Sequence, residues 1–154
     1  MESHKRSVSS VQLFPLIIEQ LEQGRRVQFT VSGSSMMPWI VSNRDSVELT
    51  AVDDLELKAG DIVLFCPFKD KYVLHRIIKA RPCGFLTAGD GNLYPDGWTP
   101  RESVIAKAVC ICRKGKKIDC GSRRWKLIFR IWMLGLPVRK YLLAFVGYLA
   151  RLKR

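Results

Sequence analysis

One serine lies where its hydroxyl and its own backbone could act on the same atom. Ser35 occurs in the run Gly33-Ser34-Ser35-Met36-Met37-Pro38, directly after the alternating segment 26–31. A serine on a tight turn at a strand end can direct both its hydroxyl and its backbone N–H to one point, where acyl transfer needs a nucleophile and an oxyanion donor. A serine in a Gly/Ser turn is, however, most often only part of the turn.

A histidine and two aspartates could supply the remaining groups. His75 lies in the largely apolar run 73–78, whereas the other histidine, His4, belongs to an N-terminal stretch that we expect to fray. His75 is therefore the base that could serve Ser35 at neutral pH, although a histidine in a strand is more often structural. Asp90 and Asp96 follow in a turn-rich loop, and either could orient the imidazole.

The elements that would position these groups are mainly strands. Residues 9–23 have the apolar spacing of an amphipathic helix, beginning with a capping box at Ser9 or nearer Pro15 and ending at Gly24. Alternating or apolar runs predict strands over 26–31, 46–51, 61–66, 72–78, 85–88 and 103–113. Turn signals separate these runs at the interval typical of a β-barrel or sandwich-like domain.

Four short motifs follow one another in a recognisable order. They are Gly33 to Pro38, Leu57 to Phe65, His75 to Ile78, and Gly89 to Asp96, and they span most of residues 28–112. In this order they resemble the signal peptidase I family, which shares its fold with LexA-like self-cleaving repressors. His75-Arg76 stands where the bacterial branch has Lys-Arg, so the chain is similar to the branch that uses a serine and a histidine.

The resemblance implies a mainly β, barrel-like domain that cleaves leader or signal segments after small residues. It makes Ser35 the nucleophile, His75 the general base, and Asp90 or Asp96, with Asp96 favoured, the supporting acid. The residues expected at the substrate and oxyanion site are Gly33, Ser34, Met36 and Pro38. The extended peptide would bind along an exposed sheet edge, and no metal or cofactor is implied. We expect helix 9–23 to stand where the family has its N-terminal membrane anchor.

The charge of the chain is unevenly distributed. Residues 1–112 hold 13 Lys/Arg and 13 Asp/Glu, whereas residues 113–154 hold 13 Lys/Arg and one acid, which supplies the whole net charge of +12. Residues 122–134 and 138–152 have helical spacing of apolar residues. Basic and aromatic residues so arranged favour a helical hairpin at an anionic membrane surface. The residues expected to contact lipid are Trp125, Arg130, Trp132, Arg139 and Lys140.

Two other interpretations of the basic segment remain open. The helices could pack on the barrel with a solvated basic face, or they could bind nucleic acid, which is disfavoured because no DNA-reading motif accompanies the charge. The expected organisation is an N-terminal helix (1–24), a peptidase domain (25–121) and a basic helical tail (122–154).

Cysteine usage bears on the compartment. Five cysteines without an apolar signal-peptide core favour reduced thiols and a cytosolic-facing environment. Together with the basic segment, this predicts a peripheral membrane location on the cytoplasmic side. A metal site from Cys110, Cys112 and Cys120 is disfavoured, because the chain lacks a paired C-x-x-C and a nearby histidine. Two other functions stay open: a cytosolic leader peptidase for a modified peptide product, and a non-catalytic, repressor-like binding module.

Overall fold

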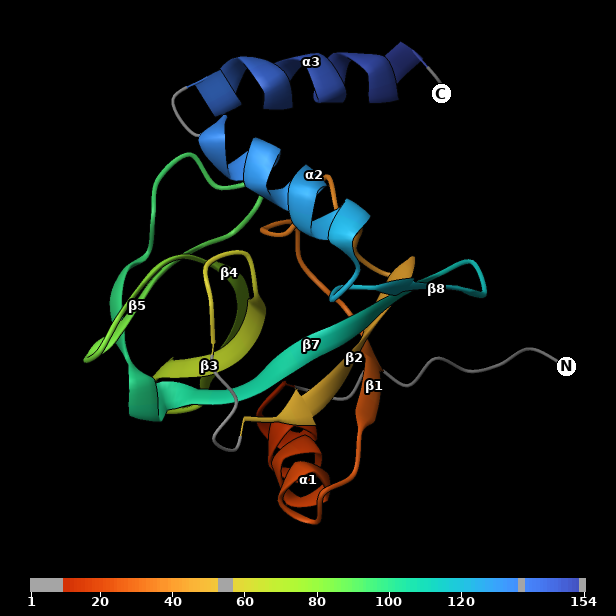
Figure 1. Cartoon of the computed structure of the whole chain (residues 1–154). Helices are drawn as coiled ribbons and strands as arrows, with labels where there is room; N and C mark the ends of the chain where they lie inside the picture. Colours follow the sequence, from red (N-terminus) through yellow and green to blue (C-terminus); the bar gives the residue numbers. More distant parts are fainter. Residues whose placement is uncertain (1–9, 53–56, 136–137, 153–154) are drawn as a thin grey trace, which may run out of the picture.

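The computed structural model describes residues 10–52, 57–135 and 138–152. This part of the chain is mainly β, with one helix before the sheet and two after it (Figure 1). The strands are β1 (Val27–Thr30), β2 (Asp45–Ala51), β3 (Ile62–Phe68), β4 (Lys71–Arg81), β5 (Gly84–Ala88), β6 (Gly97–Pro100), β7 (Val104–Arg113) and β8 (Lys116–Asp119). The helices are α1 (Ser10–Glu22), α2 (Arg123–Leu134) and α3 (Arg139–Leu152), and a short 3₁₀ turn, Arg101–Ser103, joins β6 to β7.

All eight strands form one antiparallel sheet in the order β1-β2-β7-β3-β4-β5-β6. The long strand β7 has β2 along one edge, while β3 and β8 share the other edge. Register shifts interrupt the β2–β7, β3–β4, β3–β7 and β4–β5 pairs. Such irregularities bend and twist a sheet. The strands accordingly curve round (Figure 1), and the loop after β1 meets the loop between β5 and β6.

Helix α1 packs on the sheet through one face. Phe14, Ile17 and Leu21 are buried in the main core, at the spacing that places side chains on one side of a helix. The Phe14 ring stacks on Tyr72 with centroids 4.5 Å apart. The helix runs through Pro15, and it ends before Gly24, which has the left-handed φ of +73° expected of a C-terminal glycine.

The predicted elements are confirmed within a few residues, with two exceptions. Strands β6 and β8 were not predicted, and residues 97–100 had been expected within or next to a loop. The expected capping residue Ser9 lies outside the described residues. Helix α2 contributes Phe129 to the main core, so it packs against the sheet. Among the described helices, none is both long and apolar enough to cross a bilayer.

Candidate active site

The loop that carries Ser35 joins β1 to β2 and is tied at its base. The Val31 N–H donates to the Asp45 carbonyl at 3.0 Å, and the Asn43 N–H donates to the Val31 carbonyl at 2.9 Å. The buried Met36 side chain fixes the loop to the main core. Gly33 precedes the serine with a left-handed φ of +92°, which only glycine adopts without strain. Ser35 therefore occupies a defined position, half-buried at the strand end.

Two glycines of the β5–β6 loop pack directly on the backbone of Ser35. The Gly91 N–H donates to the Ser35 carbonyl at 2.7 Å. A Cβ on Gly89 would lie 2.4 Å from the same carbonyl oxygen, and a Cβ on Gly91 would lie 3.0 Å from the Ser34 carbonyl oxygen. The sequence Gly89-Asp90-Gly91 thus permits a close backbone approach that side chains would prevent. The first and fourth sequence motifs meet at this contact.

His75 and Asp96 form the central polar contact of the site. His75 Nδ1 lies 2.6 Å from Asp96 Oδ2, and the Thr87 hydroxyl donates to the same carboxylate oxygen at 3.0 Å. The Asp96 N–H also donates to the Thr87 carbonyl at 2.8 Å, which holds the aspartate beside β5. Because an ionised carboxylate only accepts hydrogen bonds, Nδ1 carries the hydrogen in this pair. The lone pair of the neutral ring is then on Nε2, free to accept a proton.

Asp90 has a different partner. Successive side chains of a strand point to opposite faces, so Arg76 is directed away from the His75 side of β4. The buried Arg76 guanidinium makes a bidentate ion pair with Asp90, through contacts of 2.8 and 2.6 Å, and donates to the Gly60 carbonyl. Asp90 therefore holds the β5–β6 loop against β4. Of the two aspartates left open by the sequence, the structure places Asp96 on the histidine.

A groove of about 710 Å³ contains the three groups in question. Ser35, His75 and Asp96 all line it, together with an apolar wall that includes Phe65, Phe68, Tyr72, Leu74 and Trp98. A volume of this size lies within the range of pockets that hold small molecules or several peptide residues. Edge strand β6 also contributes Thr99 and Pro100 to the lining, so the groove runs beside an open sheet edge.

The residues expected around Ser35 differ in their exposure. Gly33 and Ser34 are exposed, whereas Met36 is buried and Pro38, which follows a cis peptide bond, is half-buried. The Met37 N–H is engaged by the Ser34 carbonyl at 3.0 Å. Within the described part of the chain, the Ser35 N–H has no hydrogen-bond partner. That donor is therefore available to a bound carbonyl oxygen.

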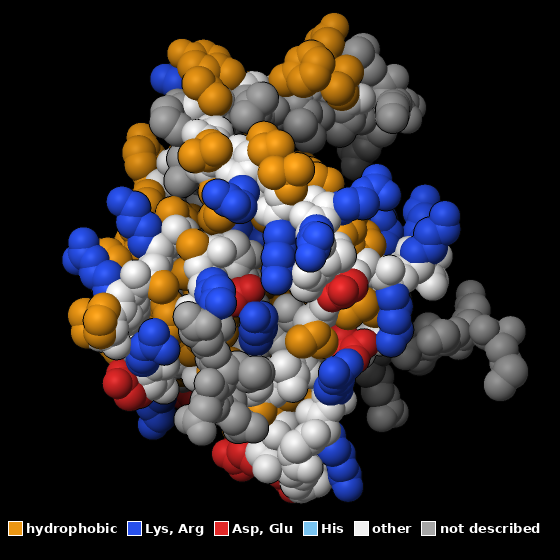
Figure 2. Space-filling view, viewed as in Figure 1, with side chains coloured by type: hydrophobic (Ala, Val, Ile, Leu, Met, Phe, Trp, Pro, Cys, Tyr) orange, Lys and Arg blue, Asp and Glu red, His pale blue; other side chains and the backbone are white. Residues whose placement is uncertain are grey.

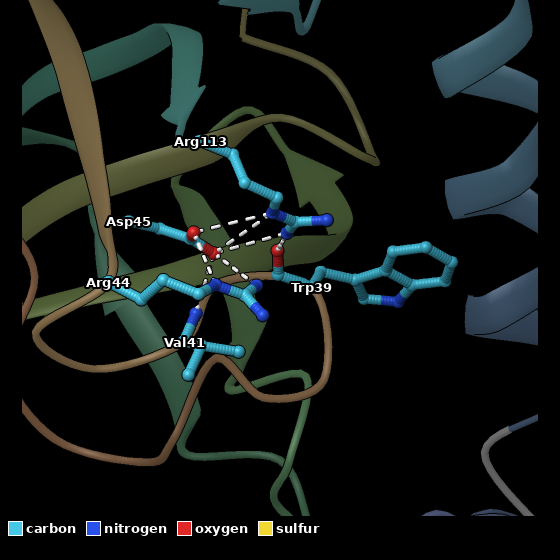
Figure 3. A network of polar contacts seen from close by, with 5 residues as sticks. All are labelled: Trp39, Val41, Arg44, Asp45 and Arg113. Carbon is cyan, nitrogen blue, oxygen red and sulfur yellow. Dashed lines mark hydrogen bonds and ion pairs between the residues drawn. The ribbon is translucent and has the colours of Figure 1, made fainter. Parts of the chain in front are cut away.

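Asp45 stabilises the end of the Ser35 loop (Figure 3). Its fully buried carboxylate accepts from the Val41 N–H and from the guanidinium groups of Arg44 and Arg113. Arg113 also donates to the Trp39 carbonyl, which ties β7 to the loop. Burial raises the pKa of Asp45, but the hydrogen bonds from Arg44, Val41 and Arg113 outweigh it and hold the pKa well below its usual range.

Helix α2 contacts the same loop through Trp39. The Trp39 ring lies edge-on against Trp125, Phe129 and Trp132, with centroids 5.6 to 5.9 Å apart. Trp125 and Trp132, which were expected to contact lipid, share a helix face with the buried Phe129 and are themselves half-buried. Their expected contact with lipid stays a prediction. Arg76 stacks on the Phe129 ring, 3.8 Å from its centroid.

The other residues expected at a membrane keep exposed positions where they are described. Arg130 in α2 and Lys140 in α3 are exposed, and Arg139 begins α3, although its side chain lies outside the described part.

The cysteines are separate from the groove. Cys110 and Cys112 lie on one face of β7 next to Glu48, with ligand atoms within 4.8 Å of one another, whereas Cys120 is not part of this group. Glu48 already binds Lys117 at 3.0 Å. Burial raises the pKa of Cys110 and raises that of Cys120 to about 12, so both remain thiols at neutral pH.

Sequence reasoning missed Thr87 and the apolar wall of the groove. Thr87 belongs to no motif, and a threonine in a strand is ordinary, so only the pairing of β5 with β4 and β6 brings it to Asp96. The wall residue Val73 could have been found, because it shares the β4 face of His75 by strand alternation. No protein-family model matches the chain, and no curated protein matches it significantly.

Proposed function

We propose that the chain is a serine endopeptidase in which Ser35 is the nucleophile, His75 the general base and Asp96 the residue that orients the histidine. The observation that carries this proposal is the 2.6 Å contact between His75 and Asp96 in the groove that Ser35 lines. A nucleophile, a base and an acid that fixes the base are the parts of a hydrolytic triad, which is recognised by geometry rather than by fold.

Each group has a defined part in the reaction. The Ser35 hydroxyl oxygen attacks the scissile carbonyl carbon while its proton passes to His75 Nε2. The Asp96 carboxylate stabilises the imidazolium that results, and the Ser35 N–H donates to the developing oxyanion. The C–N bond then breaks as His75 returns the proton to the leaving amine. Water, deprotonated by the same histidine, hydrolyses the acyl-enzyme and frees Ser35.

The groove favours an extended peptide as substrate. The outer edge of β6 can pair with a peptide backbone, while the aromatic wall takes apolar side chains. A leader or signal segment has this character, since it combines an extended cleavage region with an apolar stretch. A wall that includes Phe68 and Trp98 also suits larger side chains at some distance from Ser35.

The proposed relationship is to the Ser/His branch of the signal peptidase I family, with the barrel-like fold that this family shares with LexA-like repressors. It is supported by the meeting of the sequence motifs around one groove. Ser35 touches the Gly89–Gly91 segment, and His75 touches Asp96. Phe65, the last residue of the second motif, also lines the groove.

Cleavage of a diverse leader-peptide library by the purified full-length chain, read by mass spectrometry, tests the function. We expect cuts that disappear in Ser35→Ala and His75→Ala and persist in Ser46→Ala, a serine of β2 outside the groove. A fluorophosphonate probe should label wild type at Ser35 alone. Cleavage that survives in both Ser35→Ala and His75→Ala would contradict the proposal, and peptide binding without cleavage or labelling would favour a non-catalytic module.

A further inference from the structure

Helix α2 has a second apolar face, directed away from the sheet. Leu127, Ile131 and Leu134 follow the i, i+4, i+7 spacing that places side chains on one side of a helix. All three are exposed, by 59%, 61% and 81%. The inner face of the same helix is already occupied by the contacts of Phe129 with the core, so the outer face is not needed for folding.

Helix α3 repeats the arrangement. Tyr141, Phe145 and Tyr148 have the same i, i+4, i+7 spacing and are all exposed, with Leu149 beside them. Figure 2 shows hydrophobic side chains gathered over the upper end of the molecule, where α2 and α3 lie, with Lys and Arg side chains in the region beneath. Soluble proteins rarely leave large apolar patches exposed without a partner.

Basic residues border this outer face. On a helix of 3.6 residues per turn, Arg123 and Arg130 fall along one side of the Leu127–Leu134 row and Arg124 falls along the other. In α3 the exposed Lys140 and Arg151 share one border of the apolar row. The sequence has no Asp or Glu after Asp119, so nothing on these helices offsets the positive charge. The partner must therefore be both apolar and anionic.

We propose that the outer faces of α2 and α3 bind the surface of a bilayer that contains anionic lipids. Helices lying in the interface would bury the leucine, isoleucine and aromatic side chains among the acyl chains while the arginines and lysines meet headgroup phosphates. A second copy of this chain would bring two strongly positive faces together. A nucleic acid would leave the apolar rows exposed to water. The surface is separate from the groove and does not depend on the proposed peptidase activity.

Co-sedimentation of the full-length chain with vesicles tests this surface. We expect binding to vesicles of phosphatidylcholine with one-third phosphatidylglycerol, at least tenfold weaker binding to pure phosphatidylcholine, and weakening by salt. Leu127→Gln should weaken binding about fivefold, and Leu127→Gln with Ile131→Gln about thirtyfold. Leu16→Gln is the matched control, because Leu16 is also a leucine exposed by 59% but lies on α1.

Each other outcome counts against the proposal. Equal binding by Leu127→Gln and Leu16→Gln, at unchanged thermal stability, would show that the outer face does not meet lipid. A dimer by light scattering that becomes monomeric in Leu127→Gln, without vesicle binding, would assign the face to a second copy. Binding to duplex DNA that exceeds vesicle binding and survives the double substitution would assign the charge to nucleic acid. Ser35→Ala should bind vesicles like wild type, which keeps this test independent of cleavage.

Discussion

Asp96→Asn separates the charge of the orienting residue from its shape. Asp96 Oδ2 accepts from both His75 Nδ1 and the Thr87 hydroxyl. In the asparagine variant, the amide oxygen can accept from both donors as they stand, whereas an NH₂ group there would require the Thr87 hydroxyl to turn and the His75 hydrogen to move to Nε2. Thr87 should therefore keep the amide in the orientation that preserves the hydrogen on Nδ1 and the lone pair on Nε2.

The expected loss follows from what the substitution removes. A hydrogen bond to a charged group contributes about 1.5–3 kcal/mol. The Asp96 side chain is 26% exposed, so solvent screens part of its effect on the imidazolium. Asp96→Asn should thus lower kcat/KM by about 10- to 100-fold. Adding Thr87→Val removes the donor that selects the amide orientation, allows the NH₂ group to face Nδ1, and favours the unproductive tautomer. The double variant should lose about 10⁴-fold, the size of effect known for a wrong histidine tautomer in serine proteases.

The assay is kcat/KM on a fluorogenic peptide taken from the library cut, with thermal unfolding of each variant as the folding control. The ¹⁵N chemical shifts of the His75 ring report which nitrogen carries the hydrogen. Thr87→Val alone should lower kcat/KM only a few-fold, so the effects of the two substitutions should be strongly non-additive. Asp96→Asn with wild-type activity would refute the role of Asp96. If Asp96→Asn alone already lowered kcat/KM by 10⁴-fold, and adding Thr87→Val lowered it no further, the role of Thr87 would be refuted.

Three further perturbations test the supports of the site. Gly89→Ala forces a Cβ to 2.4 Å from the Ser35 carbonyl oxygen, so the loop must shift and activity should fall about a hundredfold in the peptide assay. Phe129→Ala should lower the free energy of unfolding in urea by about 3–4 kcal/mol, whereas the exposed Leu127→Ala should change it little. Asp45→Asn should lower the free energy of unfolding by about 3 kcal/mol at pH 7 and lower Tm by roughly 6–12 °C.

The controls and contrary outcomes follow from the same contacts. Gly121→Ala, whose Cβ meets only the flexible Asp119 side chain at 3.1 Å, should keep full activity. Because the pKa of Asp45 is lowered on folding, its stabilisation is present above about pH 4 and lost as the pH falls below that value. Asp45→Asn should therefore show less acid destabilisation than wild type. If wild type and Asp45→Asn lost stability in parallel as the pH falls, the role of Asp45 would be contradicted. If Gly89→Ala kept full activity, the role of the close contact between Gly89 and Ser35 would be contradicted.

The strands with clear alternation could be predicted from sequence, and two strands could not. Gly97 to Pro100 contains a glycine and a proline and follows Pro95, a composition that indicates turns. It becomes a strand because β5 offers an open edge at the right register, with Thr87 opposite Gly97. The polar strand Lys116–Asp119 likewise forms by pairing with β7. Both depend on tertiary partners rather than on local preference.

The residue types of the candidate site were predicted from its motifs, whereas the pairing of His75 with Asp96 was favoured only through the family resemblance. The motifs identify Ser35 and His75 as candidate site residues. Asp90 and Asp96 lie in one loop, where the local sequence does not indicate which of them contacts His75. The separation comes from β4: His75 and Arg76 point to opposite faces, and each takes a different aspartate. A buried arginine requires a partner as strongly as a histidine does, so Arg76 was the signal that could have assigned Asp90.

Helix α2 has two apolar faces, and its tryptophans lie on the face that packs against Trp39. Helical spacing groups Trp125, Phe129 and Trp132 on one side and Leu127 and Ile131 on the other. Aromatic residues suit both a membrane interface and a packed core, so composition alone cannot choose between the faces. The contacts of Trp39 identify the face that packs inward, because its ring touches all three aromatic rings of the row formed by Trp125, Phe129 and Trp132.

Helix α2 connects the basic segment to the residues that support the groove. The inner face contacts Trp39, on the loop that carries Ser35, and Arg76, the neighbour of His75 in β4. Arg76 in turn holds Asp90, whose neighbouring glycines pack on the Ser35 backbone. A displacement of α2 would therefore act on both segments that position Ser35. A membrane-bound outer face would hold α2 in place, so attachment to lipid and the geometry around Ser35 would depend on the same helix.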